Sequence, residues 1–557
     1  MPGTVQHDST EARRDRGQGG WLRQHDLWLA AVLWGLIAAA LLLLARGLPA
    51  RTFFVGDPGV KLIAARNAIE HPTRPLDVDL PRIAGQPVDF LEPFFRVHGD
   101  HAHAITSELF PVISAPLIAA FGIRGAFLLP AAGFLLAIAA IAYLGIVLDE
   151  RRSWSVLLLV AAACTPLLFY ALEFWEHALA VGVAAAGTVL FVARRSSLRL
   201  VTSGLLLGVA ALLRPEAVWY GVALFVGARW LPSRPSVQDL LFAIVGVVLA
   251  FLPFTVVSAV HSGHWFGGHV ASNLSGITQH WVATRMAILR VWFVPRNGIW
   301  IGGLLVWSIA ALAAKDNPAR GKAVCATGLA FVVVAAIAAG RRSFEPASAW
   351  NAEPALLLAF VPLAGARNGR TYLLVVALVS SSLVALTAPN DGGGQWAPRY
   401  LLFASIPLAI LTADAIERAS QGVRFVGAAT MAVLLLSCLM VQRNAYKELQ
   451  AAKRTYERIV GFVERETPAG SYVLTDLWWL DQVTAALYPT RVVLFVDGAA
   501  SVHRALGLLA TAPHVFVVRS EHESPQDSFG QWREGTAFTV IRRTDIPERS
   551  LTLVRLK

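Results

Sequence analysis

The chain reads FFVGDPGVKL over residues 53–62, directly after a long apolar run. Aspartate favours the cap position of a helix and proline its first turn, so Asp57 and Pro58 predict a helix that begins here and extends to about residue 70. An ionisable side chain held at a membrane face is costly unless it has a use. We therefore interpret Asp57 as a functional carboxylate beside the first membrane span. The alternative is that Asp57 serves only as a helix cap.

Hydrophobic residues make up 55% of the 557 residues, and charged residues make up 15%. Soluble globular proteins carry roughly a quarter charged residues, so this composition indicates a membrane protein. The net charge of +11 comes from short basic clusters between apolar runs, as expected for cytoplasmic loops, and we expect no nucleic-acid binding. The three cysteines lie inside apolar runs without CxxC spacing, which supports neither a disulfide framework nor a zinc site.

Apolar runs recur along most of the chain and predict about thirteen membrane spans. They cover residues 27–47, 124–148, 154–171, 177–193, 198–213, 216–230, 239–260, 298–314, 322–340, 354–366, 371–388, 400–417 and 424–442. Several are shorter than the roughly 20 residues that a full crossing needs, so we expect partial or broken helices around a cavity. The first run is too long for the core of a signal peptide, which predicts a retained span after a cytoplasmic tail of residues 1–26.

The predicted transmembrane domain of residues 27–442 includes a long first outer loop, residues 48–123. The C-terminal residues 443–557 are more charged and carry short strand-like runs with helix-compatible stretches between the first three of them. These runs cover residues 472–475, 492–496, 515–518 and 538–541. The predicted fold class is therefore an α-helical polytopic membrane protein with a small extracytoplasmic α/β domain.

The basic residues between the spans predict which loops face the cytoplasm. With the N-terminus inside, every predicted inside loop carries arginine or lysine, as the positive-inside rule requires. The outside loops instead carry Asp57, Glu92, Glu176, Glu345, Glu353 and Asp391. The outside exceptions to the rule are Arg296, Arg341, Arg342 and Arg399. Basic residues that lie outside despite the positive-inside rule are candidates for a functional role.

Two further acidic positions stand out within the apolar region. Glu176 lies at the predicted outer turn before the span of residues 177–193, where a functional carboxylate and one favoured only by the helix dipole are equally plausible. Arg214 and Glu216 interrupt another apolar stretch around Pro215. They are interpreted either as a pair that satisfies itself at a helix break, which we slightly favour, or as the polar wall of a cavity.

The GDPGVKLIAAR run of residues 56–66 resembles the first-loop motif of the GT-C superfamily, the glycosyltransferases that use polyprenyl-phosphate sugars. It is most similar to the bacterial relatives of protein O-mannosyltransferases and lipid A aminoarabinose transferases. Those proteins also combine about thirteen spans with a C-terminal extracytoplasmic domain. The resemblance implies that Asp57 is a general base for a sugar acceptor and that Glu176 assists it or orients the acceptor. Many relatives carry Asp-Glu at this point, whereas Pro58 follows Asp57 here.

The QWAPRY run of residues 395–400 resembles the Pro-Arg-Tyr element of the same superfamily. A guanidinium at the outer membrane face can bind a phosphate through two hydrogen bonds, so Arg399 is the first candidate for the phosphate of the donor. Anchoring to lipid headgroups is the alternative. The other candidate substrate-binding residues are Tyr400, Arg341, Arg342, Lys61, Arg214 and Glu216.

Four histidines, His261, His264, His269 and His280, lie close together within residues 261–280. No nearby carboxylate completes a ligand set, so we assign no metal ligand and interpret this segment as an interfacial loop. Some GT-C enzymes use a divalent cation and others do not. A divalent cofactor is therefore an open alternative, and no other cofactor is expected.

The resemblance implies an inverting glycosyltransferase on the outer face of the bacterial cytoplasmic membrane. It would move a sugar from a polyprenyl-phosphate donor in the lipid bilayer to a lipid, glycan or protein acceptor of the cell envelope. A lipid-linked polysaccharide ligase or polymerase competes, but it would be expected to concentrate its chemistry in a long late loop. A membrane transporter also competes, but it would show repeated halves and polar residues near the midplane.

The arrangement of charged loops predicts the sidedness of both ends of the membrane domain. A reporter fused after Lys557 should be active only outside the cytoplasm, and a reporter fused near Asn368 should be active only inside it. Paired alkaline phosphatase and fluorescent protein fusions measure this directly. A reversed result for either fusion would contradict the assignment, because Asp57 and Arg399 would then lie on opposite faces.

Overall fold

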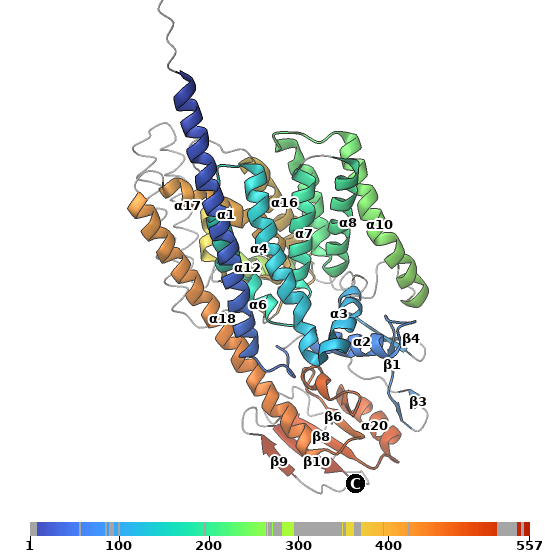
Figure 1. The fold of residues 1–557 in the computed structure, drawn as a ribbon. Helices are drawn as coiled ribbons and strands as arrows, with labels where there is room; N and C mark the ends of the chain where they lie inside the picture. The colour runs from blue at the N-terminus through green and yellow to red at the C-terminus, as the bar shows by residue number, and fades with distance from the viewer. Residues whose placement is uncertain are drawn as a thin grey trace, which may run out of the picture.

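The computed structural model describes most of the chain. It covers residues 8–54, 57–83, 86–87, 94–98, 101–193, 196–262, 265, 270, 281–293, 348, 352–360, 369–393, 395–420, 424–520, 543–546 and 551–556. Figure 1 shows a tall bundle of helices with a smaller, sheet-containing unit at one end of it.

The bundle is built from long apolar helices. They are α1 (Asp8–Arg46), α4 (Leu128–Leu148), α5 (Trp154–Ala163), α6 (Leu167–Ala171), α7 (His177–Val192), α8 (Ser197–Leu213), α9 (Glu216–Gly227), α10 (Val237–Ser262), α16 (Arg370–Thr387), α17 (Ser405–Ser420) and the first part of α18 (Arg424–Glu466). Short 3-10 turns are η1 (Gly122–Phe127), η2 (Ala228–Trp230), η3 (Pro354–Phe360) and η4 (Arg399–Ala404). Within the described residues, five segments are long and apolar enough to cross a membrane: Gln24–Arg46, Leu109–Leu148, Val237–Val260, Arg370–Thr387 and Arg399–Arg418.

The helices follow the apolar runs of the sequence closely, with one predicted run divided in two. The run of residues 154–171 is split, because α5 ends at Ala163 and α6 begins at Leu167 after Pro166. Proline lacks an amide hydrogen and clashes with the preceding turn, which explains the interruption. The expected spans at residues 298–314 and 322–340 lie outside the described residues, so the number of spans stays a prediction.

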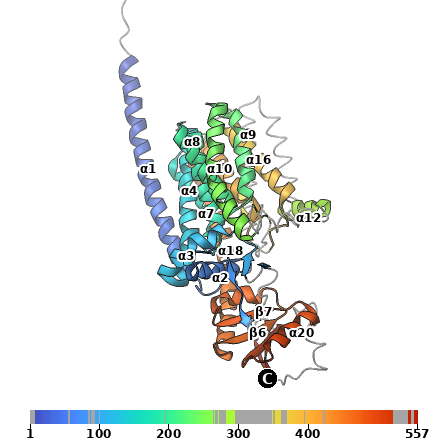
Figure 2. The ribbon, with the colours of Figure 1, turned by 90° about the vertical axis from the view of Figure 1, so that its right-hand side faces the viewer.

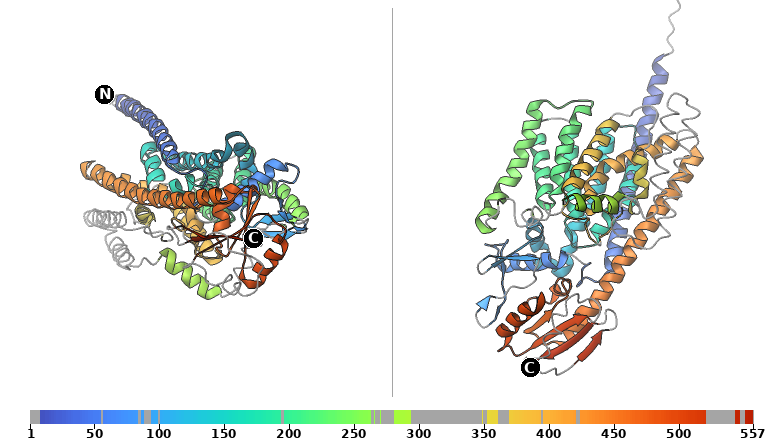
Figure 3. Two further views of the ribbon diagram at one scale, coloured as in Figure 1. Left: turned by 90° about the horizontal axis from the view of Figure 1, so that it is seen from below. Right: turned by 180° about the vertical axis from the view of Figure 1, so that it is seen from behind.

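The C-terminal unit begins on a continuous helix. The 43 residues of α18 run from the bundle straight into this unit, and they pass the expected domain boundary at residue 443 without a break. The sheet has the order β7-β6-β8-β10-β9. Its strands are β6 (Ser471–Thr475), β7 (Arg491–Phe495), β8 (Val515–Ser520), β9 (Arg543–Ile546) and β10 (Leu551–Leu556), with α19 (Leu480–Val483), η5 (Thr484–Leu487) and α20 (Gly498–Leu509) between them. Figure 3 shows the sheet from behind, beside the end of α18.

The strands of this sheet differ in how well the sequence predicted them. The runs expected at residues 472–475, 492–496 and 515–518 correspond to β6, β7 and β8, which pair in parallel. Strand β10 pairs antiparallel with both β8 and β9, and neither β9 nor β10 was expected. The fourth expected run, residues 538–541, lies outside the described residues.

The long first loop contains short strands that the sequence did not predict, together with a second helix that corresponds to an amphipathic stretch expected around residues 106–121. It holds α2 (Pro58–Glu70), the short strands β1 (Val78–Asp79), β2 (Arg82–Ile83), β3 (Gln86–Pro87), β4 (Phe95–His98) and β5 (His101–Ala104), and helix α3 (Leu109–Phe121). Strands β1, β5 and β4 form one small antiparallel sheet, and β2 and β3 form a separate pair. In Figures 1 and 2, α2 lies crosswise between the bundle and the C-terminal unit.

Helix α2 is buried on two sides rather than exposed on one. Leu62 and Ala65 belong to the hydrophobic core of the bundle, whereas Val60, Ile63 and Ala64 pack into a second core with the C-terminal sheet. Arg66, Asn67 and Glu70 form a polar arc on this helix, and of these three side chains only Glu70 is exposed. Burial of apolar side chains on both faces of α2 is the dominant contribution to holding the two units together.

The polar residues of this arc bind the neighbouring chain instead. Arg66 donates hydrogen bonds to the carbonyl oxygens of Ala485 and Ala486 at 3.3 and 3.2 Å. Asn67 donates to the carbonyl oxygen of Asp77 in the first loop and accepts a hydrogen bond from the amide of Asp79. The arc therefore joins α2 to the C-terminal unit and to the loop sheet.

Gly59 marks the closest approach between α2 and the C-terminal unit, because a Cβ atom there would overlap the backbone carbonyl of Gln482. We expect Gly59→Ala to lower the free energy of unfolding by about 1–3 kcal/mol, as overpacking of a buried contact usually does. Thermal unfolding of the purified protein in detergent measures this. Gly221→Ala is the matched control, because a Cβ at Gly221 meets no atom within 4 Å. Equal unfolding temperatures for wild type and Gly59→Ala would contradict the close contact.

Candidate active site

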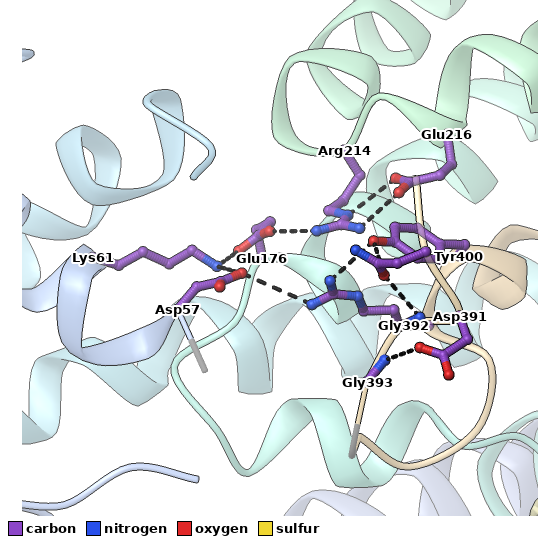
Figure 4. A network of polar contacts seen from close by, with 11 residues as sticks. Asp57, Lys61, Glu176, Arg214, Glu216, Asp391, Gly392, Gly393 and Tyr400 are labelled. Carbon is purple, nitrogen blue, oxygen red and sulfur yellow. Dashed lines mark hydrogen bonds and ion pairs between the residues drawn. The ribbon is translucent and has the colours of Figure 1, made fainter. Parts of the chain in front are cut away.

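Charged side chains from four separate parts of the chain meet where the bundle adjoins α2. Asp57 and Lys61 come from the start of α2, and Glu176 from the turn before α7. Arg214 and Glu216 flank the break between α8 and α9, and Arg399 and Tyr400 begin η4. Figure 4 shows these side chains turned toward one another.

Asp57 does not act as a helix cap. Its own backbone is helical, with φ −62° and ψ −14°, and its side chain makes no capping hydrogen bond. Instead, one carboxylate oxygen lies 3.9 Å from the Nζ of Lys61 and 3.9 Å from the Nη1 of Arg399. The Asp57 side chain is 22% exposed, so a carboxylate flanked by two cations remains accessible from outside. This geometry disfavours the interpretation of Asp57 as only a cap.

Lys61 and Glu176 form the buried centre of the cluster. Lys61 is completely buried, and its Nζ lies 2.5 Å from Oε2 of Glu176. The other oxygen of Glu176 accepts a hydrogen bond from Nη1 of Arg214 at 3.1 Å. Burial alone raises the pKa of the Glu176 carboxyl, but the charges of Lys61 and Arg214 outweigh burial and hold the pKa below its ordinary value. Glu176 is therefore an ionised bridge between two cations rather than a carboxylate that serves only the helix dipole.

Arg214 and Glu216 satisfy each other and also belong to the cluster. Helix α8 ends at Leu213 and α9 begins at Glu216, so Pro215 separates the two helices and presents both charged side chains on one side. The guanidinium of Arg214 donates to both oxygens of Glu216, at 3.1 and 2.7 Å. The two interpretations of this pair from the sequence are therefore compatible, because the self-satisfied pair also contacts Glu176.

The charges alternate along this cluster. The order is Asp57, Lys61, Glu176, Arg214 and Glu216, with Arg399 on the far side of Asp57. We call these six residues the charge chain. Three anions and three cations cancel, as buried charges require if their desolvation is to be offset. Asp57 takes part in both of the loosest contacts, at 3.9 Å, and the side chains of Asp57 and Arg399 are partly exposed, at 22% and 15%.

Arg399 is held by an aromatic residue and a turn. Its Nη2 donates to the hydroxyl of Tyr400 at 3.0 Å, and this hydroxyl donates to Oδ1 of Asn390 at 3.0 Å. The guanidinium groups of Arg399 and Arg214 lie 4.9 and 5.7 Å from the centre of the Tyr400 ring, in cation–π contact. Within the described residues, the Nε of Arg399 has no hydrogen-bond partner. This Nε is a buried donor, and it is unpaired within the described part of the chain.

The turn before Arg399 depends on glycine and on a distant helix. Gly392 has a φ of +97°, which a side chain would strain, and its amide donates to Asn390 at 2.9 Å. The indole of Trp292, at the end of α12 (Trp281–Phe293), donates to the carbonyl oxygen of Asp391 at 2.7 Å. Figure 2 shows α12 lying across the direction of the bundle helices. Sequence reasoning missed Asn390 and Trp292, although the Asn-Asp-Gly-Gly run is a recognisable turn signal.

Other sequence-based expectations cannot be placed in this cluster. Arg341 and Arg342 lie outside the described residues, as do the side chains of the four histidines considered for metal binding. Across the part of the chain that the structure describes, no group of three or more His, Cys, Asp or Glu side chains is arranged to hold a metal ion. Two cationic side chains that face Asp57 are Lys61 and Arg399.

Comparisons with known proteins give similarity in structure only. No family model matches the chain, and no curated protein matches its sequence. The chain is similar to ArnT from Cupriavidus metallidurans in the apo state, with 12% identity and a TM-score of 0.54 over 97% of this chain and 98% of that chain. ArnT bound to undecaprenyl phosphate matches with 14% identity and a TM-score of 0.53, over 94% and 97% of the two chains. The archaeal oligosaccharyltransferase AglB from Archaeoglobus fulgidus, in complex with an inhibitory peptide and a dolichol-phosphate, matches with 13% identity and a TM-score of 0.47 over 88% and 70%.

The similarity to ArnT extends over nearly the whole of both chains. ArnT is a lipid A aminoarabinose transferase of the GT-C superfamily, and the first-loop motif of the present sequence resembles that superfamily. At this level of identity, the comparison establishes the fold. The chain is therefore a multi-pass membrane protein with a fold similar to that of ArnT.

Proposed function

We propose that this protein is an inverting glycosyltransferase that moves a sugar from a polyprenyl-phosphate donor to a cell-envelope acceptor. The observation that carries the proposal is the placement of Asp57 and Arg399. They are the two partly exposed members of an otherwise buried charge chain, and their side chains are 3.9 Å apart. An accessible carboxylate beside an accessible guanidinium suits a reaction that removes a proton from one substrate and releases a phosphate from the other.

Asp57 is the proposed base. It would accept the proton of an acceptor hydroxyl or amine as that group attacks the anomeric carbon of the donor sugar. The new bond forms on the face opposite the phosphate, and the bond between the anomeric carbon and the phosphate oxygen breaks, which inverts the configuration. Lys61 and Arg399 flank Asp57 at 3.9 Å each and hold its carboxylate in place beside the proposed phosphate site.

Arg399 is the proposed ligand of the departing phosphate. Its guanidinium has a planar arrangement of donors that matches phosphate oxygens, and its Nε lacks a partner within the described part of the chain. Tyr400 and Asn390 fix its orientation before a substrate arrives. Lys61 and Arg214 add positive charge behind it, and Glu216 and Glu176 keep these cations in place. The crystal structure of ArnT with undecaprenyl phosphate supports a donor of this class on the same fold.

The setting of the site supports a donor that enters from the bilayer and an acceptor that enters from outside. Asp57 and Lys61 lie at the start of α2, which runs between the bundle and the C-terminal unit (Figure 1), and the charge chain gathers around them (Figure 4). A transporter would be expected to place its polar residues near the midplane. We place this end of the bundle on the outer face of the cytoplasmic membrane, in line with the charges of the loops. The C-terminal unit would then shape the entrance for the acceptor.

The proposed role of Asp57 is tested by Asp57→Asn. The amide keeps the shape of the side chain but accepts a proton far less readily, and a missing general base typically lowers a rate by roughly 10²–10⁴-fold. No capping hydrogen bond is lost, so thermal stability should stay close to that of wild type. Mass spectrometry of envelope glycans, from cells that lack the protein and carry either form of its gene, measures the transfer.

Asp79→Asn is the matched control for this test. Asp79 lies in the same loop and pairs with Arg74 and His71, but it is half-exposed and outside the charge chain. The control should restore the envelope glycan that Asp57→Asn fails to restore. Full restoration by Asp57→Asn would show that Asp57 is not the base, and envelope glycans that do not depend on the protein at all would overturn the proposed function.

Variants of Arg399 test the phosphate site. Arg399→Lys keeps the charge but loses the planar donor pair, so binding of undecaprenyl phosphate should weaken by about 10-fold, or about 1.4 kcal/mol. Arg399→Ala should also lower transfer by roughly 10²-fold, as the loss of a preorganised donor does elsewhere. Microscale thermophoresis with purified protein and undecaprenyl phosphate measures binding. Arg418→Lys, on α17 in the pair with Asp414, is the control. Unchanged binding by both Arg399 variants would assign Arg399 to headgroup anchoring.

A further inference from the structure

A second buried ion pair lies outside the charge chain. Glu173, in the turn before α7, and Lys453, on α18, are both completely buried, and the Nζ of Lys453 is 3.3 Å from Oε2 of Glu173. Neither residue contacts the six members of the charge chain in any described interaction. A buried pair of this kind is weak support for stability, because removing two charges from water costs about as much as their attraction returns. Its remaining contacts indicate a different role.

Glu173 also binds the backbone of both segments that carry the site carboxylates. Its Oε2 accepts a hydrogen bond from the amide of Phe54 at 2.9 Å, and its Oε1 accepts one from the amide of Phe174 at 2.9 Å. Phe54 lies three residues before Asp57, and Phe174 lies two residues before Glu176. One side chain therefore connects the segment that leads to Asp57 with the turn that carries Glu176.

Lys453 connects the same segment to the helix that leads to the C-terminal sheet. The backbone carbonyl of Lys453 accepts a hydrogen bond from the hydroxyl of Thr52 at 2.9 Å. The ammonium of Lys453 lies 4.5 Å from the ring centre of Phe127 and 5.8 Å from that of Phe53, within cation–π range. Helix α18 continues without a break into the C-terminal unit. Because Lys453 on this helix binds Thr52, the placement of residues 52–54 depends on the placement of that unit.

We propose that Glu173 is a positioning residue for the transfer reaction and that Lys453 is its counter-charge. Glu173 holds the segment before Asp57 at a fixed distance from the turn that carries Glu176. Lys453 binds Glu173 and thereby connects both segments to α18, the helix that leads to the C-terminal sheet. The inference rests on the proposed function, in which Asp57 is the base. A small displacement of a catalytic group costs rate more than it costs substrate binding, because only the transition state demands exact alignment.

The double variant Glu173→Gln with Lys453→Met separates positioning from folding. Both charges are removed together, so no buried charge is left unpaired and the unfolding temperature should stay near that of wild type. Glutamine has one uncharged acceptor oxygen in place of two carboxylate oxygens, so it cannot accept from both amides, and any bond that it keeps to Phe54 is weaker. We expect undecaprenyl phosphate to bind as in wild type, while envelope glycan formed per amount of protein falls by about 10-fold or more. Wild-type transfer by a stable double variant would overturn the proposal.

Hydrogen–deuterium exchange gives a readout that does not depend on transferase activity. The peptide containing Phe54 should exchange faster in the double variant than in wild type, because its amide loses a carboxylate acceptor. Glu464→Gln is the matched control, since it breaks the exposed pair of Arg51 and Glu464 between the same two elements. This control should change neither the exchange at Phe54 nor the transfer.

The outcomes separate this inference from the proposed function. Unchanged exchange at Phe54 in the double variant would refute the positioning role, whatever the transfer assay shows. Faster exchange at Phe54, together with envelope glycans that never depend on the protein, would instead refute the proposed function and leave the role of Glu173 in holding this segment intact. Faster exchange with reduced transfer and unchanged donor binding is the result that supports both.

Discussion

The compensation of buried charge at the junction of the bundle and the C-terminal unit is the constraint on which the rest of the structure depends. Lys61 and Glu176 are almost completely removed from water, and each is stable only because its partner comes from another part of the chain. Arg214 and Glu216 extend the same requirement to the break between α8 and α9. Four parts of the chain therefore meet in this cluster, and its accessible end is formed by Asp57 and Arg399.

Helix α2 links the charge chain to the packing of the whole molecule. Its apolar residues enter the core of the bundle on one side and the core of the C-terminal unit on the other. Gly59 allows the two backbones to touch, and Arg66 binds carbonyl groups near the start of the sheet. The C-terminal unit is thus part of the environment of Asp57. The continuous helix α18 and the pair of Glu173 and Lys453 provide a second connection to the same segment.

The similarity to ArnT shows how far one fold tolerates changes in sequence. The chains share 14% identity, yet the match covers nearly all of both. A bundle of apolar helices can keep its arrangement while its lipid-facing and core residues change, because burial depends on polarity and volume more than on exact identity. Function depends on the site that such a fold carries. In this protein, that site is the charge chain, and its chemistry is the basis of the proposed transfer.

The sequence alone determined what depends on local patterns. Apolar runs located most of the described bundle helices, although α1 and α18 extend well beyond their runs. Short strand-like runs located β6, β7 and β8, and the DPG motif located Asp57 at a helix start. It did not reveal that Lys61 pairs with Glu176, which is 115 positions away, or that Glu173 reaches the amide of Phe54 at a separation of 119. It also missed the first-loop sheet and the burial of α2 on two faces. Secondary structure follows from neighbouring residues, whereas the pairing of charges and the burial of a whole helix depend on which distant segments fold against one another.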